Sequence, residues 1–298
     1  MTAMNSEEEL RGLIDKLAGS ISPPEGLEEL LLRKTDQISG DEAILYEPML
    51  YFVLQGAKQL SVGGKTIIYK APSFLILAVE VPVDARVLEA SSEKPFLGIE
   101  MRLRREDAGN FLFELPSGLP PASGPSFGVG ELTSDMTDAL LRLARLLENP
   151  ADARSFAPLY TRELLYRIAQ GSQGSLLRDA LGGGGRFDQL RRAVQWIRSN
   201  YREKLRIETL AEIAGMSVTA FYRHFKSATT VSPGAYHKRI RLHEARRLLA
   251  HASTVSSVAF AVGYESVTQF SREYARQFGL PPGRDAARIR STPALDRR

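Results

Sequence analysis

Cysteine is absent from this 298-residue chain. The sequence can therefore form no disulfide, bind no metal through thiolates and use no cysteine as a nucleophile. Long apolar runs are missing too, since no stretch approaches the roughly 20 apolar residues that a membrane-spanning helix needs. The start, MTAMNSEEEL, is acidic where a secretory signal would be basic and then apolar. We therefore expect no membrane insertion and a cytoplasmic location.

Charge is divided unevenly along the chain. A run of glycines at 182–185 separates residues 186–298, which hold 21 Lys and Arg against 9 Asp and Glu, from a part that holds 18 against 26. The formal net charges are +12 and −8. A basic block attracts polyanions because their condensed counterions are released on binding, so nucleic acid is the first candidate partner. The length favours two domains. We predict a domain over 1–181, a glycine-rich linker over 182–186 and a DNA-binding domain over 187–298.

The N-terminal part mixes helical and extended patterns, which predicts an α+β fold. Short β-branched and aromatic runs fill residues 44–103 and predict a small barrel or sandwich. Gly63 and Gly64 favour a hairpin, because a two-residue turn needs positive φ angles. Helical spacing predicts helices over 6–19, 25–33, 106–113, 134–148 and 157–169.

The C-terminal part reads as helix throughout and contains an internal repeat. SVTAFYRHF (217–225) and SVTQFSREY (266–274) match at an offset of 49, while Gly215 and Gly263 align at an offset of 48. One extra residue in the second turn explains the difference. Each copy has a short helix, a glycine at the turn and a serine able to cap the next helix, which is the layout of a helix-turn-helix unit.

The second helix of each copy should turn one face to DNA. Aromatic residues four apart, such as Phe221 and Phe225, are expected in the core. Arginine can pair with guanine edges, hydroxyls with bases or phosphates, and an apolar side chain with the thymine methyl. The alternative is an ordinary amphipathic helix with a solvated face, which two copies in a basic block disfavour. The predicted DNA-binding residues are Thr219, Tyr222, Arg223 and Lys226, and then Val267, Thr268, Ser271 and Arg272.

A helix over roughly 233–250 should bridge the two units. Its length of about 27 Å suits a spacer that places both units on one side of a duplex. Its basic side chains are expected to divide among solvent, salt bridges and phosphate contacts. They are Lys238, Arg239, Arg241, Arg246 and Arg247.

The chain resembles the AraC/XylS family of bacterial transcription regulators through LAEIAGMSVTAFYRHFK, SPGAYHKRIRLHEARRLL and VAFAVGYESVTQFSREYARQFGLPP. The resemblance implies that the outward positions of both second helices face bases. Tyr222 departs from the smaller or amide side chains common in the family. Tyr222 against Ser271, and Ala220 against Gln269, imply that the two units contact different bases. Activation of transcription and contact with RNA polymerase are further implications.

The N-terminal part is similar to the family subgroup with a cupin-like sensor barrel, through PMLYFVLQGAKQLSVGGKTIIYKAPSFLILAVEVPV. This similarity implies a homodimer, with a small organic effector as a candidate ligand. A regulator whose N-terminal domain only dimerises remains an alternative. Four aromatic residues are candidates for an effector pocket, although packing is their commoner role. They are Tyr46, Tyr51, Phe52 and Phe74.

A cupin-type metal enzyme with a helical appendage is the main rival interpretation. All four histidines lie after the glycine run, so the predicted barrel lacks imidazoles to hold a metal or complete a hydrolase triad. Three carboxylates that could pair in a pocket, Glu47, Glu80 and Asp84, are expected in turns or on a solvated face. We therefore assign no catalytic residue, cofactor or metal. The histidines are His224, His237, His243 and His251.

Overall fold

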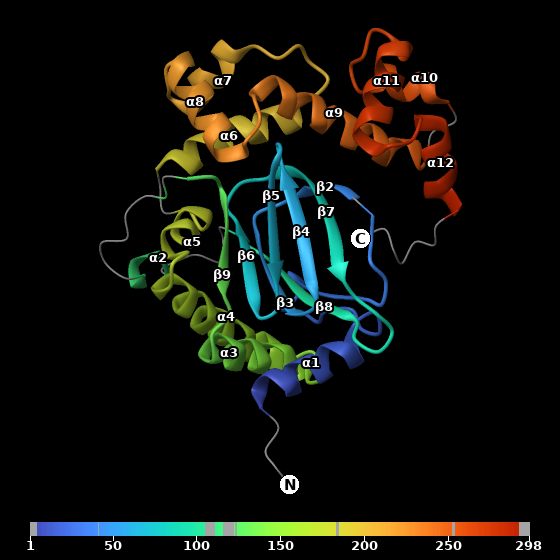
Figure 1. Cartoon of the computed structure of the whole chain (residues 1–298). Helices are drawn as coiled ribbons and strands as arrows, with labels where there is room; N and C mark the ends of the chain where they lie inside the picture. The colour runs from blue at the N-terminus through green and yellow to red at the C-terminus, as the bar shows by residue number, and fades with distance from the viewer. Residues whose placement is uncertain are drawn as a thin grey trace.

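The structure is a computed structural model that describes residues 5–40, 42–104, 111–115, 122, 124–182, 185–251 and 254–291. A β-sandwich with helices along one side forms the N-terminal part, and a group of helices lies across one end of it (Figure 1). The prediction of an α+β fold with a cupin-like barrel and an all-α C-terminal part is confirmed. In the described helices, no segment is both long and apolar enough to span a bilayer.

Two antiparallel sheets make up the sandwich. The larger sheet has the order β1-β8-β3-β6-β9 and the smaller one β2-β7-β4-β5. The larger consists of β1 (Leu30–Thr35), β3 (Met49–Gln55), β6 (Ser73–Leu77), β8 (Phe96–Arg102) and β9 (Phe127–Glu131). The smaller consists of β2 (Glu42–Tyr46), β4 (Ala57–Val62), β5 (Lys65–Lys70) and β7 (Val81–Glu89).

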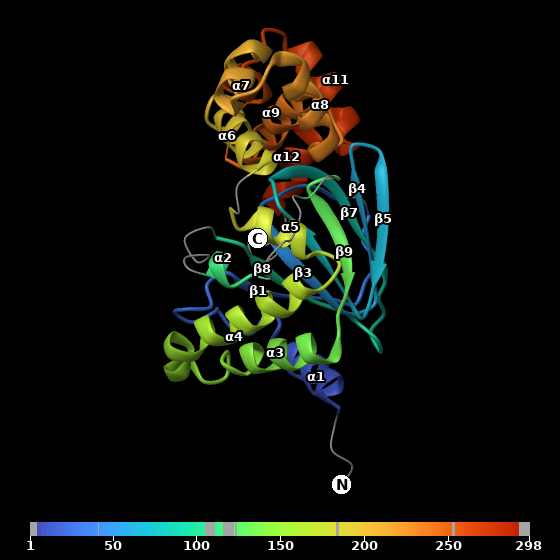
Figure 2. The ribbon, with the colours of Figure 1, turned by 90° about the vertical axis from the view of Figure 1, so that its left-hand side faces the viewer.

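The three central strands of the larger sheet, β8, β3 and β6, are buried on both faces. Leu50 and Phe52 of β3 pack toward the helices, whereas Tyr51 and Val53 pack against the smaller sheet. Successive side chains on a strand point to opposite faces, so a strand covered on both sides has a continuous apolar sequence. Helices therefore cover one side of the sandwich, and the interior between the two sheets forms a separate core (Figure 2).

Two local sequence signals in the N-terminal part had opposite outcomes: the glycine pair predicted its turn correctly, and the leucine spacing before it predicted the wrong element. Gly63 and Gly64 have φ angles of 57° and 92° and join β4 to β5, which confirms the hairpin. The helix predicted over 25–33 is wrong, because residues 30–35 form β1, which pairs with β8. The leucine spacing there is compatible with both a helix and a strand. Residues 30–35 become a strand because they pair with β8, whose edge would otherwise lack a partner.

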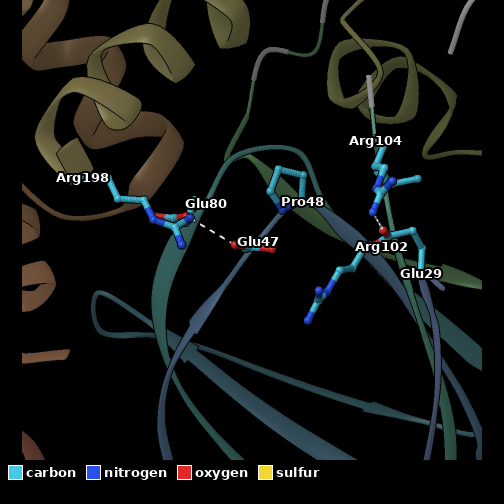
Figure 3. A pocket seen from close by; sticks show the side chains of 8 residues that line it. Glu29, Glu47, Pro48, Glu80, Arg102, Arg104 and Arg198 are labelled. Atoms are coloured by element: carbon cyan, nitrogen blue, oxygen red, sulfur yellow. Dashed lines mark hydrogen bonds and ion pairs between the residues drawn. The ribbon is translucent and has the colours of Figure 1, made fainter. Parts of the chain in front are cut away.

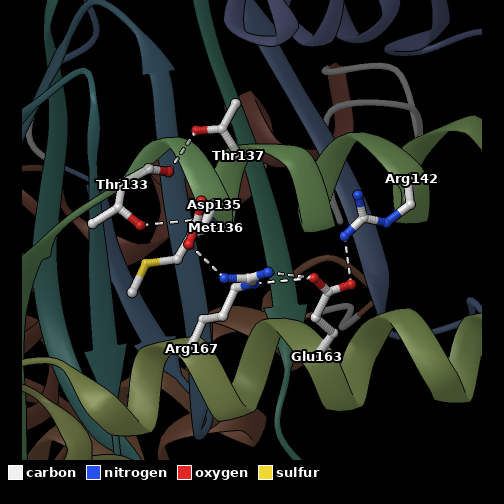
Figure 4. Close-up of polar contacts among 7 residues, drawn as sticks. All are labelled: Thr133, Asp135, Met136, Thr137, Arg142, Glu163 and Arg167. Carbon is white, nitrogen blue, oxygen red and sulfur yellow. Dashed lines mark hydrogen bonds and ion pairs between the residues drawn. The ribbon is translucent and has the colours of Figure 1, made fainter.

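Three helices pack beside the larger sheet: α1 (Ser6–Leu17), α3 (Ser134–Arg145) and α4 (Pro150–Gln170). Glu163 of α4 accepts hydrogen bonds from Arg167 and from Arg142 of α3 (Figure 4). Arg167 also pairs with Asp135 at 2.6 Å, near the start of α3. These ion pairs join α3 to α4 across their polar sides. Most of the helix predicted over 106–113 lies outside the described residues; α2 comprises Phe111–Glu114.

The C-terminal helices build two cores that share one helix. Tyr236 and Ile240 of the bridging helix belong to the core of the first unit, whereas Ala245 and Leu249 belong to that of the second. The bridge therefore does more than separate the units, since it completes both. The helices after α5 (Gly174–Ala180) are α6 (Arg186–Ser199), α7 (Ile207–Ala214), α8 (Val218–Thr229), α9 (Pro233–Leu249), α10 (Val255–Ala261), α11 (Val267–Phe278) and α12 (Pro282–Ser291).

Candidate nucleic-acid interface

Both predicted helix-turn-helix units are present, and their turns are built alike. Gly215 ends α7 with a φ of 64°, and the Met216 amide donates to the Ala211 carbonyl at 2.9 Å. Gly263 has a φ of 85°, and the next amide again donates back into the preceding helix, from Tyr264 to the carbonyl of residue 259 at 3.0 Å. A residue with a side chain would be strained at either glycine.

Serine begins the second helix of each unit. The Ser217 hydroxyl accepts a hydrogen bond from the Ala220 amide, and the Ser266 hydroxyl accepts one from the Gln269 amide, each at 3.3 Å. A capping serine satisfies an amide that the helix itself leaves unpaired. The cap stands two residues after Gly215 but three after Gly263. The one-residue slip in the repeat is therefore located in the second turn.

The buried and exposed sides of α8 and α11 agree with the predicted faces. Phe221, Phe225, Phe270 and Tyr274 are fully buried. We call the eight predicted outward residues the recognition faces. Thr219, Tyr222, Arg223 and Lys226 are exposed on α8, while on α11 Thr268 and Arg272 are exposed and Val267 and Ser271 are half-buried.

The cations on the recognition faces are available to a ligand. Among the described residues, no carboxylate lies within ion-pair distance of Arg223, Lys226 or Arg272. The Arg223 guanidinium only approaches the ring of the adjacent His224, at 3.5 Å. Desolvating an unpaired surface cation costs less than breaking an existing ion pair, so these groups can approach phosphate or guanine at little cost.

The basic residues of α9 are engaged within the protein instead. Arg246 pairs with the buried Asp285, Arg247 with Glu244, and Lys238 lies 3.7 Å from Glu273. Arg239 donates to the carbonyl of residue 82 in the sandwich. Most of the basic side chains of α9 therefore form hydrogen bonds or ion pairs within the protein. Fewer cations remain available to DNA than the net charge of +12 suggests.

Arg241 connects the two units. Its guanidinium donates to the carbonyls of Tyr201 at 2.6 Å, Arg202 at 3.0 Å and Glu203 at 2.9 Å, in the loop before α7. It also donates to the carbonyl of Gly263 at 3.1 Å, in the turn of the second unit. A Cβ on that glycine would stand 2.5 Å from the Arg202 carbonyl oxygen, so glycine is needed for the two loops to meet. Sequence patterns gave no signal for this clamp.

Figure 1 shows the two units at opposite ends of α9, α7 and α8 at one end and α10 and α11 at the other. The helix has 17 residues, about 26 Å at 1.5 Å per residue. With Arg241 bound to loops of both units, the bridge sets their distance and their relative rotation.

Comparison with known proteins agrees with this arrangement. A helix-turn-helix domain model matches residues 210–288, the region of both units. The model described as AraC-type transcriptional regulator N-terminus matches residues 26–176, half of the chain. The chain belongs to the AraC-type transcriptional regulators. It is therefore a helix-turn-helix DNA-binding regulator of transcription, and the resemblance noted in its sequence is confirmed.

Relatives of this AraC-type regulator include the transcriptional activator RhaS of Citrobacter koseri. It is 27% identical over 192 residues, which cover 61% of this chain and 68% of RhaS. Among solved structures, ToxT of Vibrio cholerae has a TM-score of 0.59 at 10% identity and covers 88% of this chain and 98% of its own. A ToxT structure with a bound unsaturated fatty acid has a TM-score of 0.57 at 11% identity and covers 86% and 94%. At such low identity, ToxT shows a shared two-domain fold only.

The sandwich of this AraC-type regulator contacts its helix-turn-helix part through Glu80. This carboxylate is 6% exposed, although a turn or a solvated face was expected for it. It pairs with Arg198 of α6, and the Tyr236 hydroxyl of α9 donates to the Glu80 carbonyl at 3.0 Å. Burial raises the pKa of Glu80, against the opposing effect of Arg198. Glu47 also pairs with Arg198, at 3.1 Å, so this one arginine binds two glutamates of the sandwich.

A pocket of about 340 Å³ lies beside this contact (Figure 3). Arg104 pairs with Glu29 on one side of it and Arg198 with Glu47 on the other. Among the described residues that line it, three arginines face three glutamates, so these residues give the pocket no net charge. The lining residues are Glu29, Glu47, Pro48, Glu80, Arg102, Leu103, Arg104 and Arg198.

The β4–β5 hairpin of this AraC-type regulator contacts the C-terminal end of α8. The Thr230 hydroxyl donates to the Val62 carbonyl at 2.5 Å, and Thr230 holds a positive φ of 62°. A Cβ at Gly63 would lie 2.6 Å from Cγ1 of Val231 and 2.8 Å from the carbonyl oxygen of Thr230. The hairpin thus fits closely against the helix-turn-helix part.

Gly63→Ala is expected to lower the free energy of unfolding by about 1 to 3 kcal/mol more than Gly64→Ala does, because only the first adds overpacking. Both glycines have positive φ, so alanine causes backbone strain at either position. A Cβ at Gly64, however, would meet no atom within 4 Å. Denaturant unfolding of the two variants measures the difference. Equal losses would mean that the hairpin does not dock on α8 in solution.

Histidines near the bridge predict acid sensitivity. Burial lowers the pKa of His237 to about 4, and the Arg241 guanidinium adds to the effect. His237 lies within 2.9 Å of the Tyr201 carbonyl, to which its neutral ring can donate. The unfolded chain protonates this histidine near its ordinary pKa, so it binds more protons than the folded chain below about pH 6.5, and stability falls as the pH falls toward 4.

His237→Gln, which keeps a donor without a titratable ring, should therefore reduce the acid sensitivity. Between pH 7 and pH 5 the wild-type protein is expected to lose about 2 kcal/mol more stability than the variant, at 1.36 kcal/mol per unit of pKa difference. Denaturant unfolding at the two pH values measures this. Parallel pH profiles would show that His237 is not held neutral.

Proposed function

We propose that this regulator binds promoter DNA sequence-specifically through the recognition faces of α8 and α11, one unit in each of two neighbouring stretches of major groove. The observation that carries the proposal is the contrast between Arg223, Lys226 and Arg272, which are exposed without a carboxylate partner, and the arginines of α9, which are bound internally. In this proposal the two arginines contact guanine edges and Lys226 contacts phosphate.

The two units should contact different bases. Tyr222 on α8 corresponds to Ser271 on α11, and Ala220 corresponds to Gln269. A phenol, a hydroxymethyl group and an amide differ in reach and in hydrogen-bonding capacity. The binding site of one protomer is therefore asymmetric.

The proposal also covers activation, an effector, the oligomeric state and the location. Relatives support the first two, and the sequence analysis suggests the others. RhaS is named an activator, which supports activation and contact with RNA polymerase. The ToxT structure with a fatty acid supports a small-molecule effector in this chain as well. We include a homodimer, a cytoplasmic location, no enzymatic activity, and the domain division at the glycine run between α5 and α6. The alternative, a regulator without an effector, would share the DNA interface.

The test uses the full chain and a high-affinity site selected from random duplexes. The affinity, measured by fluorescence anisotropy, should fall linearly with salt on logarithmic axes, with a slope of about −0.9 for each phosphate contacted. Binding to the selected site should exceed binding to a scrambled duplex by roughly 10³ or more. If selection enriches no sequence although the protein binds DNA at low salt, the proposal of sequence-specific contact is wrong.

A further inference from the structure

The recognition faces of α8 and α11 differ in which side the rest of the protein covers. At intervals of four residues, α8 has a row of exposed side chains, whereas the same row of α11 is half-buried. Val267 of that row packs against the core of the second unit. One side of the face predicted for α11 is therefore partly closed to DNA. The row on α8 is Val218, Tyr222 and Lys226, and on α11 it is Val267, Ser271 and Ala275.

The other side of α11 is open and polar. Gln269, Arg272 and Arg276 follow one another at spacings of three and four residues, which places them in one row along the helix, and all three are exposed. On α11 the arginine that both helices share is therefore flanked by an amide and a second guanidinium. The same row of α8 has a methyl and a hydroxymethyl group at those two positions. In α8 the matching residues are Ala220, Arg223 and Ser227.

The last cation of each recognition helix is displaced by one residue between the two units. Lys226 of α8 corresponds to Ala275 of α11, whereas Arg276 of α11 corresponds to Ser227 of α8. One residue turns an α-helix by roughly 100°. The cation near the end of α11 therefore lies on the opposite side of the shared arginine from the cation near the end of α8.

Gln269 and Arg276 are available to a ligand. In the part of the chain that the structure describes, no carboxylate lies within ion-pair distance of Arg276, and the side chain of Gln269 makes no hydrogen bond. Glu273, the nearest carboxylate in sequence, accepts from the Tyr264 hydroxyl at 2.7 Å and lies 3.7 Å from Nζ of Lys238. Both side chains can therefore exchange water for DNA without breaking an internal contact.

We infer that α11 contacts DNA mainly through the row of Gln269, Arg272 and Arg276, and is rotated about its axis relative to the way α8 makes contact. This inference rests on the proposed function and adds two binding residues to it. Gln269 lies in the first turn of α11, where recognition helices contact base edges, and glutamine can form two hydrogen bonds to adenine. Arg276 lies about 10 Å further along the helix axis, where a guanidinium can bind the phosphate backbone. The half-site of the second unit should therefore contain an adenine that the first half-site does not require.

The experiment measures variants of the full chain by fluorescence anisotropy, on the duplex that wild type selects and on a scrambled duplex. Gln269→Ala should weaken binding to the selected duplex by about tenfold and leave binding to the scrambled duplex unchanged. Selection repeated with this variant should lose the preference for adenine at one position. Arg276→Met should weaken binding to both duplexes and reduce the salt slope by about one unit. Ser271→Ala, in the half-buried row, should lose less affinity than Gln269→Ala.

Two exposed residues of α4 give matched controls, since Gln170→Ala and Arg154→Ala remove the same groups outside both helix-turn-helix units. Both should bind DNA as wild type does. A transfer variant combines Ala275→Lys with Arg276→Ser and so moves the cation to the position it has on α8. This variant should bind no more tightly than Arg276→Ser alone, because the transferred cation lies in the half-buried row.

The inference is overturned if Gln269→Ala loses no more affinity for the selected duplex than Ser271→Ala, if Arg276→Met leaves the salt slope unchanged, or if the transferred lysine restores the affinity of wild type. Arg223→Ala and Arg272→Ala are measured in parallel. Losses in these two variants, with none in the Gln269 and Arg276 variants, would contradict this inference alone. No loss in any of the variants would contradict the proposed function itself.

Discussion

Arg223→Ala and Arg272→Ala should each weaken binding to the selected DNA site by about 1 to 3 kcal/mol, or roughly 5- to 150-fold. Both guanidiniums stand on exposed helix faces directly opposite fully buried aromatic residues, so their removal leaves the core unchanged. Neither has a carboxylate partner among the described residues, so no internal charge is orphaned. The loss should therefore come from lost contacts with DNA.

Fluorescence anisotropy with the selected duplex and with a scrambled duplex distinguishes contacts to bases from contacts to phosphates. A base contact lowers affinity for the selected site much more than for the scrambled one, whereas a phosphate contact lowers both and reduces the salt slope by about one unit. Arg154→Ala is the control, since Arg154 is an exposed arginine on α4, beside the sandwich and outside both helix-turn-helix units. Equal losses on both duplexes would assign Arg223 and Arg272 to phosphate.

Arg241→Met should cost about 2 to 4 kcal/mol of stability and at least tenfold in affinity for the selected site. The guanidinium donates to four carbonyls in two loops, and methionine replaces the stem but none of these donors. The unpaired carbonyls would loosen the loop before α7 from the turn at Gly263. The second unit would then no longer bind with a fixed position relative to the first, and their joint affinity would fall.

Arg247→Met provides the comparison on the same helix. Arg247 is exposed, and among the described residues its one ion-pair partner is Glu244, three residues away, so its loss should cost well under 1 kcal/mol. Denaturant unfolding and anisotropy are measured for both variants. If Arg241→Met loses no more affinity than Arg247→Met, the relative placement of the two units does not depend on the clamp.

Much of the DNA interface could be predicted from the repeat. A glycine that favours positive φ, a serine that caps a helix and aromatic residues four apart are local signals, and each acts within a few residues of the chain. They identified α8 and α11 as the second helices of the two units and separated their buried positions from their exposed ones. A local signal also gave the one wrong element, at residues 25–33. The leucines there have helical spacing, but the structure forms strand β1 from residue 30 onward.

The sequence by itself determined the two helix-turn-helix units and their outward residues, because caps, turns and amphipathic faces depend on neighbours in the chain. Only the tertiary structure decided which of the basic residues remain available. Arg241 clamps two loops, Arg198 holds Glu80, and Lys58 lies buried beside Tyr46, although in composition all three are cations like Arg223. Residues far away in the sequence decide which group pairs with a charged side chain and whether water reaches it. A local sequence pattern contains no information about those distant residues.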